Sequence, residues 1–137
     1  MANLHNYHGR YCEAEFESTF LSYLEEAGWS YLAGSSLPRD SMRDVLYTDD
    51  MEFFLNRTNP DLTADEIQQI MDTVRLAGAE SDFATLHKVY DWMVNGIQFT
   101  PQAALPRMVN LIEFEDPEKN VFRAVNQFTV EYTNNGP

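Results

Sequence analysis

Hydrophobic side chains recur at steps of three and four residues along roughly the first hundred positions, which is the spacing of the buried face of an α-helix. The first such stretch runs from Glu13 to Ala27 and is followed by Gly28, a residue type that often ends helices. Its apolar positions are Phe16, Phe20, Leu21 and Leu24. The pattern predicts an amphipathic helix that packs this face inward and stops before Gly28.

Thr63 and Glu66 mark the clearest helix start. Their side chains can each bond the backbone N–H of the other residue, an arrangement called a capping box. This helix is predicted to end at Gly78, and a further helix is predicted to end near Gly96. The predicted inward positions are Ile67, Ile70, Met71 and Val74 in the first helix, and Phe83, Leu86, Tyr90 and Met93 in the second.

Two shorter helices are expected between these stretches. Pro38 suits the first turn of one helix, and Thr48 suits the N-cap of the other. Their predicted inward positions are Met42, Val45 and Leu46 in the first, and Met51, Phe54 and Leu55 in the second. A brief extended segment is expected from Trp29 to Ala33, so residues 13–96 are predicted to hold about five helices.

The pattern changes from helix to strand at residue 107. Residues Arg107 to Phe114 are apolar on both sides, whereas Val121 to Tyr132 alternate, with Asn126 on a largely apolar face and Gln127 on the opposite one. The sequence EDPEKN at 115–120 predicts a turn that joins the two strands as an antiparallel ribbon. The predicted fold class is therefore α+β, mainly helical and followed by a two- to three-stranded sheet over 107–132.

The length of 137 residues and the composition indicate one folded domain at 13–137, behind a polar leader at 1–12. No apolar run approaches the about 18 residues of a membrane span, so a cytoplasmic protein without membrane contact is expected. Nine Lys and Arg against 22 Asp and Glu give a net charge of −13, and such a surface repels DNA phosphates. His5, His8 and Cys12 in the leader lack a fourth ligand, so no metal site is expected there.

Four segments carry a resemblance to a known family. They are EAEFESTFLSYLEEAGWSYLAG at 13–34, NPDLT at 59–63, VNGIQF at 94–99 and LIEFEDPEKNVFRAVNQFTVEY at 111–132. Together they resemble the part of type I restriction enzyme R subunits that immediately precedes the nuclease residues. The resemblance covers the chain from about Glu13 onward, so residues 13–137 are expected to form the N-terminal part of an R-subunit nuclease domain.

The resemblance implies a PD-(D/E)xK nuclease core, in which one Asp and the Glu of a Glu-x-Lys pair bind Mg²⁺ for DNA cleavage and the Lys helps to position the nucleophile. In the family these residues follow the position that matches Asn134 to Pro137. Neither predicted strand of this chain holds a Glu-x-Lys or Asp-x-Lys triplet. The chain is therefore expected to be an N-terminal fragment with no complete metal site and no activity of its own.

The parent enzyme implied by the resemblance is an ATP-dependent type I deoxyribonuclease that cleaves unmethylated foreign DNA. Its implied partners are DNA and the methyltransferase and specificity subunits. ATP would bind further motor domains, because no GxxxxGK(S/T) motif occurs in this chain.

Within the chain, the resemblance points to carboxylates on the first helix. Glu17 matches the family's first-helix carboxylate, and Glu13 lies one turn earlier on the same side. The alternative is that both belong to an exposed acidic face. Asn126 needs a hydrogen-bond partner on its apolar face and is interpreted as a structural amide, whereas Gln127 is the candidate for DNA contact.

Two other interpretations stay open. An acidic DNA mimic or anti-restriction protein would present carboxylates in place of phosphates, and the net charge of −13 agrees with it. A helical domain with a small sheet and no activity is the plainer alternative. The edge of the strand from Val121 to Tyr132 would be able to pair with a second copy, so a homodimer is a further hypothesis.

Overall fold

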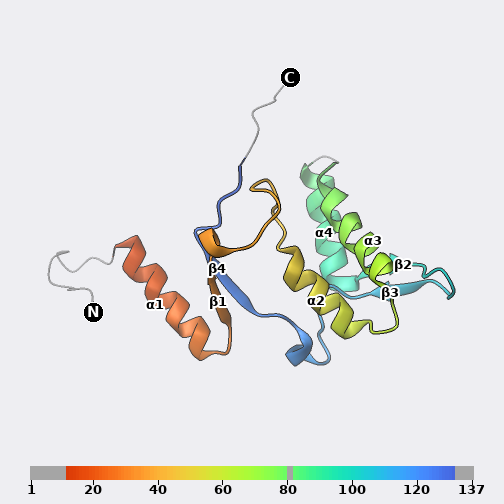
Figure 1. Cartoon of the computed structure of the whole chain (residues 1–137), viewed down its shortest axis with the longest axis horizontal. Coiled ribbons are helices and arrows are strands. Elements are labelled where there is room, and N and C mark those ends of the chain that lie inside the picture. Colours follow the sequence, from red (N-terminus) through yellow and green to blue (C-terminus); the bar gives the residue numbers. More distant parts are fainter. Residues whose placement is uncertain (1–11, 80–81, 132–137) are drawn as a thin grey trace, which may run out of the picture. The chain divides into compact units, whose positions relative to one another are not determined.

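The computed structural model describes residues 12–79 and 82–131 and has an α+β fold. Within these residues, four α-helices accompany two small sheets of two strands each (Figure 1). The chain divides into two compact units. One is formed by the described residues up to Val45 and from Phe122 onward, and the other by Leu46–Val121. The fold class predicted from the sequence is confirmed.

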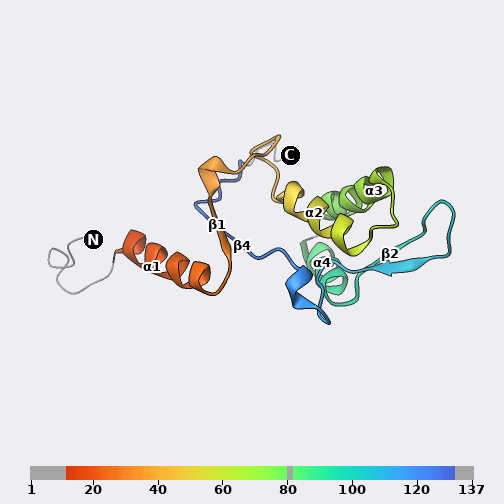
Figure 2. The same ribbon diagram turned by 60° about the horizontal axis from the view of Figure 1, so that its bottom comes forward.

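In the first unit, a parallel pair of strands joins the N-terminal segment of the chain to the C-terminal one. Its elements are helix α1 (Glu13–Glu26), strand β1 (Ser30–Ala33), the 3-10 turn η2 (Gly34–Ser36) and strand β4 (Arg123–Asn126). Figures 1 and 2 both show β1 and β4 side by side, and the register pairs Ala33 with Asn126. Because the strands are parallel, their carboxyl ends lie at the same edge.

The second unit is a helical layer with a β-hairpin. Its elements are α2 (Thr48–Thr58), α3 (Ala64–Arg75), η3 (Leu76–Ala79), α4 (Asp82–Asn95), β2 (Ile97–Phe99), β3 (Arg107–Val109) and the 3-10 turn η4 (Pro117–Lys119). Strands β2 and β3 pair antiparallel. The most deeply buried side chains are Leu55, Ile67, Ile70 and Val109, each under 2% exposed. This core belongs to the second unit alone.

The predicted start of α3 is confirmed, since Thr63 is its N-cap and forms the expected capping box with Glu66. The backbone N–H of Thr63 donates to Glu66 Oε2 at 2.9 Å, and the N–H of Glu66 donates to Thr63 Oγ1 at 3.2 Å. The predicted strand segment 29–33 also agrees with β1. Both of these correct predictions rest on signals from neighbouring residues alone.

The predicted antiparallel ribbon of 107–114 with 121–132 is wrong. Strand β3 pairs with β2, and β4 pairs with β1 in the parallel sense. Between β3 and β4 the chain forms a loop in place of a hairpin. The Asn120 side chain closes this loop, because its Nδ2 donates to the Glu113 carbonyl at 2.7 Å and its Oδ1 accepts from the Glu113 N–H at 2.8 Å. The end of the predicted strand, Tyr132, lies outside the described residues.

The short helix expected after Pro38 is not formed, and α2 begins differently from the prediction. Residues 37–47 contain turns and bends, held in part by the Arg39 guanidinium, whose Nη1 donates to the Asp44 carbonyl at 3.0 Å. Thr48 is the first residue of α2, and Tyr47 occupies the N-cap without a side-chain cap bond. The described residues therefore form four α-helices, whereas about five were expected.

The inward faces predicted for α1 and α4 are only partly correct. In α1, Leu21 and Leu24 are half-buried as expected, but Phe16 is 66% exposed and Phe20 is 55% exposed. In α4, the predicted inward residues are all exposed: Phe83, Leu86, Tyr90 and Met93. The opposite side of α4 is the half-buried one, and its Trp92 packs on the core of the second unit. Because both sides of α4 carry apolar residues, periodicity could not identify the buried side.

Candidate functional site

Helix α1 turns back toward β1 through a tight C-terminal cap. Gly28 has φ 94°, a left-handed conformation that glycine adopts without the steric cost of a Cβ. The N–H of Gly28 donates to the Glu25 carbonyl at 3.0 Å, and the N–H of Trp29 donates to the Leu24 carbonyl at 2.9 Å. These are the two bonds of a Schellman motif. The cap ends α1 and directs the chain into β1.

The carboxyl ends of β1 and β4 are in direct backbone contact. A Cβ added to Gly34 would lie 2.4 Å from the carbonyl oxygen of Gln127 and 2.5 Å from that of Asn126. Only a residue without a side chain allows this approach. Immediately after β4, Gln127 has φ 50°. The strand therefore bends at the edge where the candidate residues predicted from the sequence lie.

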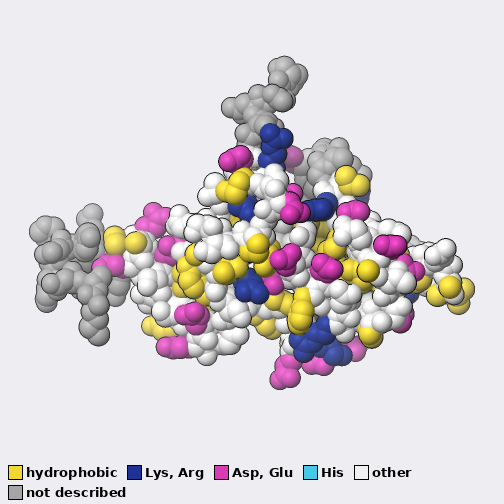
Figure 3. All heavy atoms as spheres, in the orientation of Figure 1, with side chains coloured by type: hydrophobic (Ala, Val, Ile, Leu, Met, Phe, Trp, Pro, Cys, Tyr) yellow, Lys and Arg dark blue, Asp and Glu magenta, His cyan; other side chains and the backbone are white. Residues whose placement is uncertain are grey.

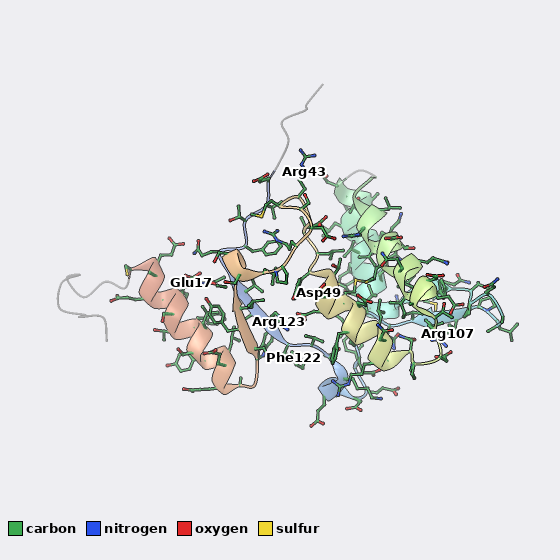
Figure 4. The ribbon with its side chains drawn as sticks, in the orientation of Figure 1. Glu17, Arg43, Asp49, Arg107, Phe122 and Arg123 are labelled. Atoms are coloured by element: carbon green, nitrogen blue, oxygen red, sulfur yellow. The ribbon has the colours of Figure 1, made fainter. Side chains whose placement is uncertain are left out.

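A recess of about 230 Å³ lies between α1 and this strand pair. Figure 4 shows Glu17 on the side of α1 that faces β1 and β4. The residues that line the recess are Ala14, Glu17, Ser18, Leu21, Ser22, Glu25, Tyr31 and Asn126. Carboxylate, hydroxyl and amide groups thus share one small concave surface.

Two hydrogen bonds connect the predicted site residues to their surroundings. The side-chain amide of Gln127 donates through Nε2 to Glu17 Oε1 at 3.1 Å. The hydroxyl of Tyr31 donates to Asn126 Oδ1 at 2.8 Å, which supplies the kind of partner expected for a structural amide. The structure thus brings Glu17, Asn126 and Gln127 together, while their roles stay predictions.

Glu13 is not part of this cluster. It is exposed and is absent from the residues that line the recess. Because Glu13 lies in the first turn of α1, its carboxylate interacts favourably with the positive end of the helix dipole and stabilises the helix, which is a structural role. The interpretation as an exposed acidic residue therefore describes Glu13 better than it describes Glu17, which is half-buried.

Tyr31 and Arg39 also belong to this region, although neither was predicted from the sequence. Arg39 Nη2 donates to the Thr129 carbonyl at 2.8 Å, and its guanidinium lies 4.2 Å from the ring centroid of Phe128. Tyr31 bonds Asn126 across 95 positions, and Arg39 bonds Thr129 across 90. No local sequence pattern predicts contacts between residues that are so far apart in the chain.

Comparison with known proteins gives the family. Residues 10–137 match the family described as type I restriction enzyme R protein N terminus. The chain belongs to this family. It is also 31% identical, over 125 residues, to a Methanocaldococcus jannaschii protein named as the endonuclease subunit of the type I restriction enzyme MjaIXP. That similarity covers 85% of this chain and 12% of the relative, so the chain spans about an eighth of the relative's length. No solved structure matches the chain.

The residues described for this R-protein N-terminal chain do not fit a complete Mg²⁺ site. Residues 12–79 and 82–131 contain no group of three or more His, Cys, Asp or Glu side chains that could hold a metal ion. Mg²⁺ requires near-octahedral oxygen coordination, usually with one or two carboxylates beside waters and substrate phosphates. Glu17 by itself is a single carboxylate, which is fewer ligands than such a site requires. His5 and His8 lie outside the described residues, and Cys12 is the N-cap residue of α1.

A second polar cluster, in the second unit, has a structural explanation. Arg107 contacts Asp61 at 2.6 Å and donates to Asn59 Oδ1 at 2.7 Å, which ties β3 to the turn before α3. The hydrogen bond from the Arg107 side chain lowers the pKa of Asp61. Backbone N–H groups of Thr63 and Gln102 lower the pKa of Glu66. Both carboxylates thus accept hydrogen bonds that connect parts of the fold.

The surface of the R-protein N-terminal chain shows no basic stripe on the face drawn in Figure 3. Acidic side chains are scattered there among hydrophobic ones, with basic side chains at separate places. This agrees with the net charge of −13. In the described ranges no helix combines the length and the apolar character needed to cross a bilayer.

Proposed function

We propose that this chain forms the amino-terminal part of the nuclease domain in an R subunit of a type I restriction enzyme. The whole complex would use ATP and Mg²⁺ in the cytoplasm to cleave unmethylated foreign DNA. The observation that carries the proposal is the family match over residues 10–137. The contact between Glu17 and Gln127, at the carboxyl ends of a parallel strand pair, supports it as a local site.

Glu17 is the proposed catalytic-site carboxylate of this part of the domain. It is half-buried and opens onto the recess, so its charge can act on a bound group without full competition from solvent. The carboxylate also accepts the Gln127 amide, which orients it. Glu13 has neither feature. The proposal therefore assigns Glu17 in preference to Glu13.

The chain alone is proposed to be inactive, because its described residues supply too few ligands for Mg²⁺. The Asp and Glu-x-Lys of the nuclease, and the sites for ATP, are proposed to belong to other parts of the R subunit. The methyltransferase and specificity subunits are the proposed partners. With a net charge of −13, most contacts to DNA phosphates must come from these other components.

A plasmid-cleavage assay tests the proposal. The chain alone is compared with the complete restriction complex that contains it, on unmethylated and methylated plasmid with Mg²⁺ and ATP. We expect cleavage only by the complex and only of unmethylated DNA. Glu17→Gln in the complex should lower the cleavage rate by about tenfold or more, while Glu13→Gln should leave it near the wild-type value.

Two results would contradict the proposal. Mg²⁺-dependent cleavage by the chain alone would show that it holds a complete active site. An unaltered rate in the Glu17→Gln complex would remove the proposed role of that carboxylate. If the isolated chain instead inhibits unrelated DNA-binding nucleases, the acidic DNA-mimic alternative would be supported.

A further inference from the structure

Gln127 has a backbone conformation that its residue type seldom adopts. Its φ of 50° makes it the non-glycine residue with a positive φ in the part of the chain that is described. In this region the Cβ of an L-residue approaches the backbone carbonyl, so such a residue persists only where the surrounding structure holds it. Residues held in this way concentrate at functional sites.

The backbone before the bend is held by close packing. Gly34 lies against the carbonyls of Asn126 and Gln127, at distances that leave no space for a Cβ. Asn126 is also held through its side chain, by the Tyr31 hydroxyl at 2.8 Å. The end of β4 therefore cannot shift along β1 without breaking both contacts.

The backbone after the bend is held by contacts from the loop that follows β1. Arg39 donates to the Thr129 carbonyl at 2.8 Å and covers the ring of Phe128 at 4.2 Å. Further along, the Glu131 N–H donates to the Met42 carbonyl at 2.9 Å. The bend at Gln127 is thus fixed from both sides.

The bend directs the Gln127 side chain toward α1. In a regular strand, consecutive side chains point to opposite faces, so Asn126 and Gln127 would diverge, as the sequence predicted. Here Asn126 lines the recess beside Glu17, and Gln127 bonds Glu17 directly across 110 positions. The positive φ of Gln127 explains how the side chains of both residues lie on the side of the strand that faces α1.

We infer that Gln127 is a positioning residue whose amide holds the Glu17 carboxylate in one orientation at the carboxyl ends of β1 and β4. The inference rests on the proposed function, in which Glu17 serves DNA cleavage. It differs from the predicted direct DNA contact, because in it the Gln127 amide acts through Glu17, to which Nε2 donates.

The variant Gln127→Asn separates the side-chain bond from the backbone bend. Asn tolerates positive φ better than Gln, but its side chain is shorter by one methylene, about 1.5 Å, and so cannot span the present 3.1 Å contact. We expect the midpoint of chemical unfolding of the 137-residue chain to stay the same or to rise. The matched control is Gln98→Asn, at an exposed position in β2.

Nuclear magnetic resonance detects the contact without any cleavage. The side-chain amide of Gln127 gives its own ¹H–¹⁵N signals, and Glu17→Gln should shift them beyond the line width. Glu13→Gln, one turn away on α1, should leave them in place. Unshifted Gln127 signals in the Glu17→Gln chain would overturn the inference.

Cleavage by the complete complex gives the functional result. Gln127→Asn is expected to lower kcat about tenfold with an unchanged KM for DNA, because it misplaces a reacting group without removing a DNA contact. Combining it with Glu17→Gln should reduce kcat no further than Glu17→Gln alone, because both changes remove the same positioned carboxylate. Gln98→Asn should retain the wild-type kcat.

The outcomes separate the inference from the function on which it rests. A wild-type complex that does not cleave DNA would overturn the proposed function and this inference together. A complex that cleaves normally, and keeps its kcat with Gln127→Asn, would overturn the inference alone. A raised KM with an unchanged kcat would return Gln127 to the DNA-contact role and would also overturn it.

Discussion

At the scale of single residues, the candidate site depends on Gly34. Replacing Gly34 by Ala would place a Cβ 2.4 Å from a backbone carbonyl oxygen, which cannot move as a flexible side chain would. We expect Gly34→Ala to lower the free energy of unfolding by about 1–3 kcal/mol, as overpacking does, measured by urea denaturation. Gly28→Ala is the comparison, because Gly28 has open space around it and a cost of about 1 kcal/mol from its positive φ alone. A neutral Gly34→Ala would contradict the close strand contact.

Two carboxylates make stability depend on pH. The pKa of Asp61 lies below its ordinary value of 3.8 because Arg107 bonds it, and that of Glu66 lies below 4.5 because two backbone N–H groups bond it. A depressed folded pKa means that the unfolded chain binds more protons in acid. The contribution of both groups is therefore complete above pH 4.5 and is lost as the pH falls through the lower folded values.

We expect Glu66→Gln to reduce this pH dependence, measured as the free energy of unfolding between pH 6 and acid. The reason is that the amide cannot titrate, so its contribution no longer changes with pH. Glu52→Gln, at an exposed position of α2, is the control and should keep the wild-type slope. A Glu66→Gln chain with the wild-type slope would show that other carboxylates carry the acid sensitivity.

Residue by residue, the candidate site was predictable only in part. Glu17 was predicted from a resemblance between sequences and Gln127 from its place on the more polar face of a strand, and the structure places the two in contact. Tyr31 and Arg39 were missed because their partners lie 95 and 90 positions away. Alternation placed Gln127 away from Asn126, and one positive φ reversed that expectation. Backbone exceptions of this kind arise from tertiary packing and leave no periodic signal.

At the scale of elements, the capping box of α3 gives a direct comparison. Thr63→Ala removes the N-cap oxygen that accepts from Glu66, so we expect unfolding to become easier by about 1 kcal/mol. Thr48→Ala is the matched control, because Thr48 is the first residue of α2 and makes no cap bond. Thermal or urea unfolding measures both. Equal losses would contradict the assignment of Tyr47 as the N-cap of α2.

The difference between short-range signals and long-range packing explains which elements could be predicted. Helix positions follow from short-range spacing, and α1, α3 and α4 were all located. The buried side of α4 could not be, since apolar residues occupy both of its sides and only the neighbouring elements select one. Strand partners were equally hidden, because alternation identifies a strand without naming its neighbour. The parallel pairing of β1 with β4 joins opposite ends of the chain, which a local turn signal cannot predict.

At the scale of the whole chain, a high negative charge coexists with exposed apolar side chains. The net charge is −13, while α4 exposes Phe83 at 80%, Leu86 at 70% and Tyr90 at 67%. Apolar side chains gathered on one helix face favour association, and repulsion between like-charged copies opposes it. Ionic strength therefore decides which effect prevails, because the Debye length falls from about 10 Å at 0.1 M salt to about 3 Å at 1 M.

We accordingly expect the isolated chain to be monomeric at low salt and to associate increasingly as salt is raised, measured by sedimentation velocity. The double change Phe83→Ser with Leu86→Ser should suppress the association, since it removes two apolar side chains of one face. Leu105→Ser is the control: Leu105 is 83% exposed but lies outside α4, so its loss should have little effect. Association that survives the double change would point instead to the edge of the strand from Val121 to Tyr132, where the sequence predicted a homodimer. Association that weakens with salt would show that charged contacts hold the copies together.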